Sequence, residues 1–234
     1  MTAPAPPPRE TSLTFIKGLA VLRAFDAEHA ALSSADVARR AGLDRATARR
    51  LIRTLEYLGY VRRAGRLYWL TPRVLILAAG FLQANRFGLA VQPILTAAAE
   101  RLGVQIVLAM RDGDAAVLVA QSAAGAYHVS LGLTLGSRLP LETTALGQVL
   151  LAGGPDAPAE LAGVGEAGHA HVSGRFEPGV AGLAVPVGPP GGVQAALGIS
   201  LPAARLEDEG FRTQALEALR GCARALAASL AAPG

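Results

Sequence analysis

The sequence predicts an α+β protein of two domains, a small basic domain that is mainly helical and a larger one that combines helices with antiparallel strands. The chain has 234 residues, of which 51% are hydrophobic, so it can build one or two cores. Residues 1–80 hold 13 Lys and Arg against 6 Asp and Glu, whereas the remainder holds 9 against 12. Apolar residues recur at helical spacing in the first part and form strand-like runs between turn residues in the second.

Composition excludes several classes of protein. The mean hydropathy of +0.35 comes from Ala and Val spread along the chain, and Gly and Pro interrupt the longest uncharged stretches. We therefore expect no transmembrane segment and no membrane partner. The start MTAPAPPPRE predicts a flexible Pro-rich tail over residues 1–11 rather than a secretion signal. The single cysteine, Cys222, cannot form an internal disulfide, which predicts a cytoplasmic protein.

Two short helices open the basic domain, which we expect over residues 12–71. Ser12 is a candidate cap for the first helix, and we expect its apolar residues to face the core: Phe15, Ile16, Leu19, Leu22 and Phe25. The second helix begins at a capping box formed by Ser33 and Asp36, and Gly42 ends it. A third helix, capped by Asp44, follows directly, so this pair has the helix-turn-helix pattern.

The third helix, residues 45–58, separates apolar from basic side chains. Its predicted core stripe is Ala48, Leu51, Ile52, Leu55 and Leu58. In a helix-turn-helix, the first residues of this helix reach base edges, which suits Arg45, Ala46, Arg49 and Arg50, whereas Arg53 is placed for a phosphate. The alternative is a solvated cationic face. Because these like charges stand beside a single acid, Glu56, we favour contact with double-stranded DNA.

A basic hairpin follows the third helix. Residues 60–61 and 67–70 read as two strands joined by a tight Ala-Gly turn, and we expect Arg62, Arg63 and Arg66 at its tip. Such a wing lays arginines along a phosphate backbone or in a minor groove. The alternative is an edge hairpin whose charges prevent aggregation.

These residues resemble a known family. The stretch from KGLAVLRAF through RRAGRLYWLTPRVLILAAGFLQAN resembles the DNA-binding half of the IclR family of bacterial transcriptional regulators, and above all the branch that controls catabolism of protocatechuate and hydroxybenzoate. The resemblance resumes at LGLTLGSRLPLETTALGQVLLAG and FEPGVAGLAVPV. It implies a winged helix-turn-helix domain joined to a GAF-like α+β effector-binding domain. It also implies a homodimer or homotetramer that binds double-stranded DNA under the control of a small organic acid.

The linker and the second domain follow from turn residues and apolar runs. We expect a linker over residues 72–87, helical to residue 84, and a second domain over residues 88–234. Its expected elements are a helix over residues 91–102, a hairpin around RDGD, a strand over residues 127–133, a hairpin over residues 180–187 and 193–201, and a closing helix over residues 206–230.

The segment GSRLPLETTALGQ contains the candidate effector site. Thr143 and Thr144 precede a helix whose first amides, those of Ala145, Leu146 and Gly147, can bind a carboxylate. Arg138 is a candidate charged partner. The family resemblance adds Gly182 and Ser200 on strands. The alternative is that the threonines only cap the helix. An aromatic acid is the expected effector, although a hydroxylated or weakly charged ligand is also compatible with this segment.

No enzymatic, metal or cofactor site is predicted. The chain has no G-x-S-x-G elbow, no H-E-x-x-H pair and no P-loop. Gly163, Gly165 and Gly168 match G-x-G-x-x-G but lack the flanking strand, so a flexible loop is the better interpretation. His169 and His171 have no third ligand nearby. The alternative function is a DNA-binding protein whose second domain serves only oligomerisation or partner recruitment.

Overall fold

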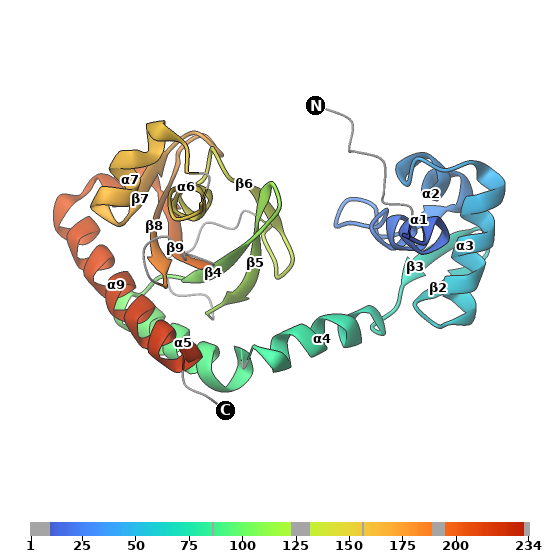
Figure 1. The fold of residues 1–234 in the computed structure, drawn as a ribbon, viewed down its shortest axis with the longest axis horizontal. Helices are drawn as coiled ribbons and strands as arrows, with labels where there is room; N and C mark the ends of the chain where they lie inside the picture. Colours follow the sequence, from blue (N-terminus) through green and yellow to red (C-terminus); the bar gives the residue numbers. More distant parts are fainter. Residues whose placement is uncertain (1–9, 86, 123–131, 156, 189–194, 232–234) are drawn as a thin grey trace. The chain divides into compact units, whose positions relative to one another are not determined.

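The computed structural model describes residues 10–85, 87–122, 132–155, 157–188 and 195–231, and the chain divides into two compact units, Met1–Phe81 and Leu82–Gly234 (Figure 1). Most of the expected Pro-rich tail and of the expected strand over residues 127–133 lies outside the described residues. The described end of that strand, Gly132 and Leu133, is not in a strand.

The first unit contains three helices and a small sheet. The helices are α1 (Leu13–Leu22), α2 (Ser34–Arg40) and α3 (Arg45–Tyr57), and the strands are β1 (Leu32–Ser33), β2 (Val61–Ala64) and β3 (Leu67–Leu70), in the order β1-β3-β2. The predicted caps are confirmed. Ser12 accepts from the amide of Phe15, Ser33 and Asp36 form the capping box, and Asp44 accepts from the amide of Thr47 at 2.9 Å.

The predicted core face of α1 is wrong in part. Phe15, Ile16 and Leu19 are 68%, 43% and 43% exposed, whereas the chain buries Val21 and Phe25. The core of this unit consists of the buried side chains of α2 and α3, β1 to β3 and the end of α1. Only the last turn of α1 and the residues after it reach this core, so its first turns stay exposed. Leu58 of the predicted α3 stripe is also exposed, because it is the cap residue at which the helix ends.

The wing forms with a different turn from the one expected. β2 begins at Val61 and continues to Ala64, so Arg62 and Arg63 lie within the strand and the turn is Gly65-Arg66. Gly65 has φ +60°, which a residue without a Cβ adopts without strain. Of the three arginines predicted at the tip, only Arg66 is there.

The second unit is built on a six-stranded antiparallel sheet. Its strands are β4 (Val107–Asp112), β5 (Ala115–Gln121), β6 (Arg138–Pro140), β7 (Ala170–Ser173), β8 (Val180–Val187) and β9 (Ala195–Pro202), in the order β6-β5-β4-β9-β8-β7. The hairpins β4–β5 and β8–β9 confirm the predicted pairing. β6 was not predicted, since three residues give too short an alternation to detect.

Helices cover both faces of this sheet (Figure 1). One core holds side chains of α5 (Gln92–Leu102), α9 (Glu209–Ala231) and the π-helical turn Phe87–Val91 against the sheet. On the other face α6 (Ala145–Ala152) packs on the sheet with Leu139 and Leu141. The linker helix α4 (Val74–Ala84) confirms the predicted helix. No single helix in the described ranges is long and apolar enough to cross a membrane, although α4 and Phe87–Leu102 meet that test jointly as a pair bent by 62°.

Two expectations for the second unit are corrected. The glycine-rich segment expected as a flexible loop instead forms the short helix α7 (Ala162–Ala167), which follows the turn Ala159–Leu161. Gly168, with φ +64°, is the residue that ends α7. The closing helix is divided at Asp208 into α8 (Ala203–Glu207) and α9, since Asp208 has an extended backbone and its carboxylate accepts from the amide of Phe211.

Candidate nucleic-acid interface and candidate ligand pocket

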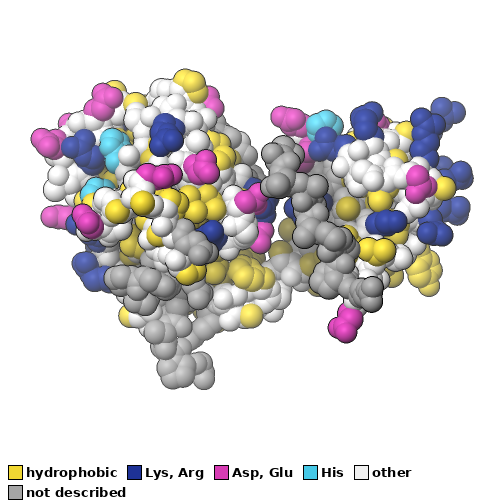
Figure 2. Space-filling view, turned by 45° about the horizontal axis from the view of Figure 1, so that its top comes forward, with side chains coloured by type: hydrophobic (Ala, Val, Ile, Leu, Met, Phe, Trp, Pro, Cys, Tyr) yellow, Lys and Arg dark blue, Asp and Glu magenta, His cyan; other side chains and the backbone are white. Residues whose placement is uncertain are grey.

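The basic face of α3 is exposed along its length. Its exposed residues include Arg45, Ala46, Arg49, Arg50 and Arg53, and no carboxylate of a described residue is ion-paired with any of their guanidinium groups. The two arginines of α2, by contrast, are ion-paired. Figure 2 shows Lys and Arg side chains gathered at the edge of the first unit where Figure 1 places α3. This face therefore presents uncompensated positive charge suited to a polyanion.

The two arginines of α2 are held by the protein itself. Arg39 is ion-paired with Asp36 at 2.8 Å, and Arg40 donates to Asp26 and, at 2.6 Å, to the carbonyl of Ala24. The pKa of Asp36 is lowered chiefly by the hydrogen bond from Ser33, and that of Asp26 chiefly by the hydrogen bond from His29, while Arg39 and Arg40 have smaller effects in the same direction. Arg39 and Arg40 thus have acidic partners, whereas among the described residues the α3 arginines have none.

The arginines of the wing are held against the hairpin to different extents. The Arg62 guanidinium lies 4.6 Å from the centre of the Trp69 ring, and Arg63 lies 6.0 Å from that of Tyr68 while its Nε donates to the carbonyl of Gly65. Both are cation–π geometries, which fix the side chains without neutralising them. Arg66 is exposed in the turn. The wing therefore adds three positive charges on the strand and turn that follow α3.

Thr71 and Arg73, at the boundary between the first domain and the linker, are hydrogen-bonded to the residues at which α3 ends. The Thr71 hydroxyl donates to the carbonyl of Gly59 at 2.6 Å, and the Thr71 amide donates to the carbonyl of Tyr60 at 2.9 Å. The Arg73 guanidinium donates to the carbonyl of Leu58, the cap residue of α3. These three bonds, which we call the linker clamp, attach the residues before α4 to the candidate recognition helix.

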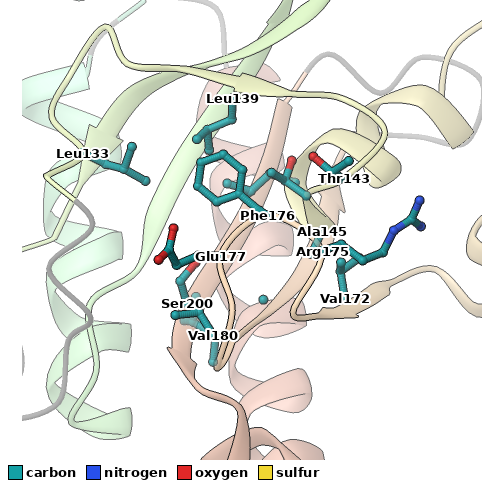
Figure 3. A pocket seen from close by; sticks show the side chains of 14 residues that line it. Leu133, Leu139, Thr143, Ala145, Val172, Arg175, Phe176, Glu177, Val180 and Ser200 are labelled. Carbon is teal, nitrogen blue, oxygen red and sulfur yellow. The ribbon is translucent and has the colours of Figure 1, made fainter.

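A pocket opens beside the start of α6 in the second unit (Figure 3). Its cavity volume is about 40 Å³, and the hollow reaches about 450 Å³ only when the solvent at its open mouth is included, so the pocket is shallow and open. Most of the wall is aliphatic or aromatic. The lining residues are Leu133, Leu139, Thr143, Thr144, Ala145, Leu146, Val172, Arg175, Phe176, Glu177, Val180, Gly182, Ile199 and Ser200.

The start of α6 leaves two backbone amides for a ligand. Thr144 caps the helix: its hydroxyl accepts from the amide of Gly147 at 3.1 Å and donates to the carbonyl of Pro140 at 2.7 Å. The Gly147 amide is thereby occupied, which corrects its predicted role as an open donor. Among the described residues, no acceptor is bonded to the amides of Ala145 and Leu146. These two amides lie at the positive end of the α6 dipole, where an anion is stabilised.

Three glycines let α6 lie close to its neighbours. A Cβ on Gly147 would lie 2.3 Å from the Cα of Leu141, and one on Gly198 would lie 2.9 Å from Leu146 Cδ2. Gly147 is therefore required for packing and does not line the pocket. Gly182 faces the start of α6, since a Cβ there would lie 3.3 Å from that of Ala145, and it pairs with Ser200 across β8 and β9. The pocket floor is thus set by small residues.

Arg138 is not part of this pocket. Its guanidinium is ion-paired with Asp112 and, at 2.9 Å, with Asp114, the acids that flank the β4–β5 turn, and these partners raise its pKa. The expectation that Arg138 accompanies the α6 amides is therefore wrong: β6 pairs with β5, which brings Arg138 to the acidic turn. Sequence spacing alone did not reveal this pairing because the segment between β5 and β6 is long.

The β7–β8 connection supplies pocket residues that the sequence analysis missed. Arg175, Phe176 and Glu177 follow β7 and line the mouth. Figure 3 shows the Phe176 ring across the mouth, the Glu177 carboxylate on the side of Leu133, and the Arg175 guanidinium directed away on the opposite side. The signal for these residues was the GRFEPG segment itself, which directly precedes the predicted strand 180–187 that contains Gly182.

In the described ranges, no group of three or more His, Cys, Asp or Glu side chains could hold a metal ion, so His169 and His171 form no such site there. His169 Nδ1 lies 3.1 Å from the carbonyl of Ala167. Partial burial, with a smaller effect of Arg212, lowers the pKa of His171.

Both halves of the chain match one family. Residues 15–65 match the IclR helix-turn-helix domain, and residues 85–162 match the C-terminal domain of the bacterial transcriptional regulator IclR. A Pca operon regulatory protein of Acinetobacter baylyi is 31% identical over a match that covers 90% of this chain and 86% of that protein. The chain belongs to the IclR family. This confirms the predicted recognition, and the fold of a helix-turn-helix domain followed by an α+β domain.

Other IclR relatives are similar over shorter lengths. A Pca regulon regulatory protein of Pseudomonas putida is 35% identical over 58% of this chain, and the match spans only 47% of that protein. A p-hydroxybenzoate hydroxylase transcriptional activator of Acinetobacter baylyi is 34% identical over 58% of this chain and 51% of its own length. The names of these relatives agree with the predicted branch.

Solved IclR structures have the same fold along nearly the whole chain. A transcriptional regulator from Rhodococcus sp. RHA1 superposes with a TM-score of 0.79 at 32% identity, covering 94% of this chain and 99% of that one. An IclR homologue from Microbacterium hydrocarbonoxydans, crystallised with 4-hydroxybenzoate, superposes with a TM-score of 0.77 at 24% identity, covering 93% of this chain and 98% of that one.

Proposed function

We propose that this IclR-family chain is a dimeric transcriptional regulator whose affinity for operator DNA is controlled by a small aromatic carboxylic acid. The observation that supports it most is the coexistence, in one chain, of an uncompensated basic helix face and of an apolar pocket with two available amides at a helix start. The first suits a nucleic acid and the second suits an apolar acid.

The DNA contacts follow from the position of each arginine. Arg45, Ala46, Arg49 and Arg50 occupy the first turns of α3, which in a helix-turn-helix enter the major groove. Arg53 is one turn further along and is placed for a phosphate, as are Arg62, Arg63 and Arg66 of the wing. Because an arginine can bond a guanine edge with two hydrogen bonds, Arg49 and Arg50 are the candidates for sequence recognition.

Dimer formation is supported by apolar side chains that the first unit leaves exposed. On α1, Phe15 and Leu19 are exposed, and on α4 the exposed residues are Leu75, Ile76 and Leu77. Large apolar side chains that stay exposed are typical of protein interfaces. We propose that a second copy of the chain covers them, which would place two α3 helices on a pseudopalindromic operator.

The ligand class follows from the pocket. The Ala145 and Leu146 amides suit a carboxylate, and the apolar wall around them suits the face of an aromatic ring. Thr143, Gly182 and Ser200 complete the site: the two hydroxyls can bond the ligand, and Gly182 leaves room for it beside α6. The names of the relatives make 4-hydroxybenzoate and protocatechuate the first acids to examine.

The proposal is tested by measuring operator binding with and without the acid in the whole protein and in two pocket variants. Ala145→Asp places a carboxylate where the ligand carboxylate would bind, and Gly182→Ala adds a methyl group at the same point. Both should abolish the response to 4-hydroxybenzoate and retain DNA binding. An unchanged response in both would place the effector elsewhere and leave Thr144 as a cap only.

The alternative is that the second unit only oligomerises or recruits a partner. A thermal-shift screen of small organic acids separates the two functions, because a ligand that binds only the folded state raises the melting temperature.

A further inference from the structure

We infer that Glu177 makes the pocket selective for acids that carry a hydrogen-bond donor at the end opposite their carboxylate. The inference rests on the proposed function, since it assumes that the pocket binds an aromatic acid. It adds the residue that distinguishes a hydroxylated acid from the unsubstituted one, and neither the family match nor the names of the relatives assign that role.

The Glu177 carboxylate lies at the mouth of the pocket. In the described part of the chain, no hydrogen bond or ion pair involves its side chain, in contrast to the acids of the β4–β5 turn. Its backbone is well held: its carbonyl accepts from the amide of Val180, and the carbonyl of Val180 accepts from the amide of Gly174. The carboxylate therefore projects from a connection between β7 and β8 whose backbone is held by hydrogen bonds.

Two polar side chains of the pocket, Glu177 and Thr143, lie on different sides of an apolar centre, and Ser200 lies on the side of Glu177. Figure 3 shows Glu177 and Thr143 on opposite sides of the Phe176 ring, and Thr143 directly precedes the cap of α6. Aliphatic side chains of Leu133, Leu139 and Val172 line the wall. A rigid ligand that places its carboxylate at the α6 amides would direct its far end along this wall to the side of Glu177.

Charge sets the orientation of such a ligand. A ligand carboxylate is repelled by Glu177 and attracted by the positive end of the α6 dipole, so the two ends of the pocket favour different groups. Because an ionised carboxylate only accepts hydrogen bonds, the group that meets Glu177 must donate one. A phenolic hydroxyl para to the acid satisfies this condition, and an aromatic amine in the same place does so as well.

The experiment is isothermal titration calorimetry of the full chain with benzoate, 4-hydroxybenzoate, 4-aminobenzoate and 4-methoxybenzoate. Wild type and Glu177→Met, which keeps the length of the side chain but removes the acceptor, are compared with Glu142→Gln. That control removes an exposed carboxylate that lies near the start of α6 but does not line the pocket.

Wild type should bind 4-hydroxybenzoate about tenfold more tightly than benzoate. This factor is at the low end of the range for a hydrogen bond to a charged group, because Glu177 is exposed to solvent. It should bind 4-methoxybenzoate no more tightly than benzoate. In Glu177→Met the preference should disappear while benzoate affinity stays constant or rises, and Glu142→Gln should retain the preference. Tighter binding of 4-aminobenzoate than of 4-hydroxybenzoate would still support the role of Glu177 as the acceptor. It would indicate that the site prefers aminobenzoic acids.

Two results overturn the inference and leave the proposed function standing: wild type binds all four acids equally, or Glu177→Met binds benzoate and 4-hydroxybenzoate with the wild-type ratio. Failure of all four acids to bind wild type would instead remove the proposed ligand class, and this inference with it.

Discussion

Gly147→Ala should unfold or severely destabilise the second unit and leave the first intact. A Cβ at this position would lie 2.3 Å from both Cα and the carbonyl oxygen of Leu141 and 2.6 Å from its carbonyl carbon. These are backbone atoms, so relief requires that α6 move from the segment that follows β6. Overpacking of a core costs about 1–3 kcal/mol, and we expect at least the upper value, about 3 kcal/mol, because no flexible side chain can yield. For a unit of about 150 residues, this lowers the melting temperature by roughly 6–12 °C.

The assay uses two signals that report on different units. Trp69, the one tryptophan of the chain, lies in β3 of the first unit, so its fluorescence follows that unit, whereas calorimetry follows both. The matched control is Gly163→Ala in α7, where a Cβ would meet nothing within 4 Å and should stabilise the helix by about 0.5–1 kcal/mol. A Gly147→Ala melting temperature within experimental error of wild type would refute the packing of α6 described above.

Three further results are expected. Arg49→Ala should weaken operator binding by about 1–3 kcal/mol if Arg49 bonds a guanine, whereas Arg220→Ala should not, because the Arg220 guanidinium bonds the carbonyl of Ala167 in the second unit. Fluorescence anisotropy on operator and random DNA measures both, and equal losses on the two DNAs would assign Arg49 to a phosphate. Arg73→Ala breaks one bond of the linker clamp and should reduce the ligand-induced change in operator affinity, with the affinity for 4-hydroxybenzoate unchanged in calorimetry. Burial raises the pKa of the Cys222 thiol to about 11, so its contribution to stability is complete below pH 9 and is lost as the pH rises to about 11. A thiol reagent at pH 8 should therefore react with Cys222 in the denatured protein and very slowly in the native one, and equally fast reaction would contradict its burial.

Local signals predicted the first unit well. The caps at Ser12, Ser33 and Asp44 bind amides within three residues, so the sequence alone places them. The exposure of Phe15 on α1 was not predictable from helical periodicity, which identifies an apolar face but not what covers it. The position of Arg62 also depended on the exact turn: a shift of the turn to Gly65-Arg66 moves that arginine from the tip into a strand.

Predictions for the pocket depended on how far apart the partners lie in the sequence. The start of α6 was found because Thr144 and the amides that follow it are adjacent in the chain. Gly182 and Ser200 came from the family resemblance, and they now line the pocket with Thr143. Arg138 was misplaced because β6 pairs with β5 across a long segment, and local sequence does not encode that pairing. Glu177 was missed because it stands in the short connection between β7 and β8, and local sequence does not reveal that this connection borders a pocket.

The affinity of the full chain for the duplex that it selects from a random-sequence DNA library, measured by fluorescence anisotropy with and without 4-hydroxybenzoate, tests most directly whether an acid controls its DNA binding. We expect the selected duplex to be pseudopalindromic and to bind more tightly than random DNA of equal length, with weaker binding at higher salt. We also expect the acid to change this affinity by a factor of about 5–150, the usual range of allosteric coupling. Selection of no preferred sequence, or an affinity that no aromatic acid changes, would contradict this function.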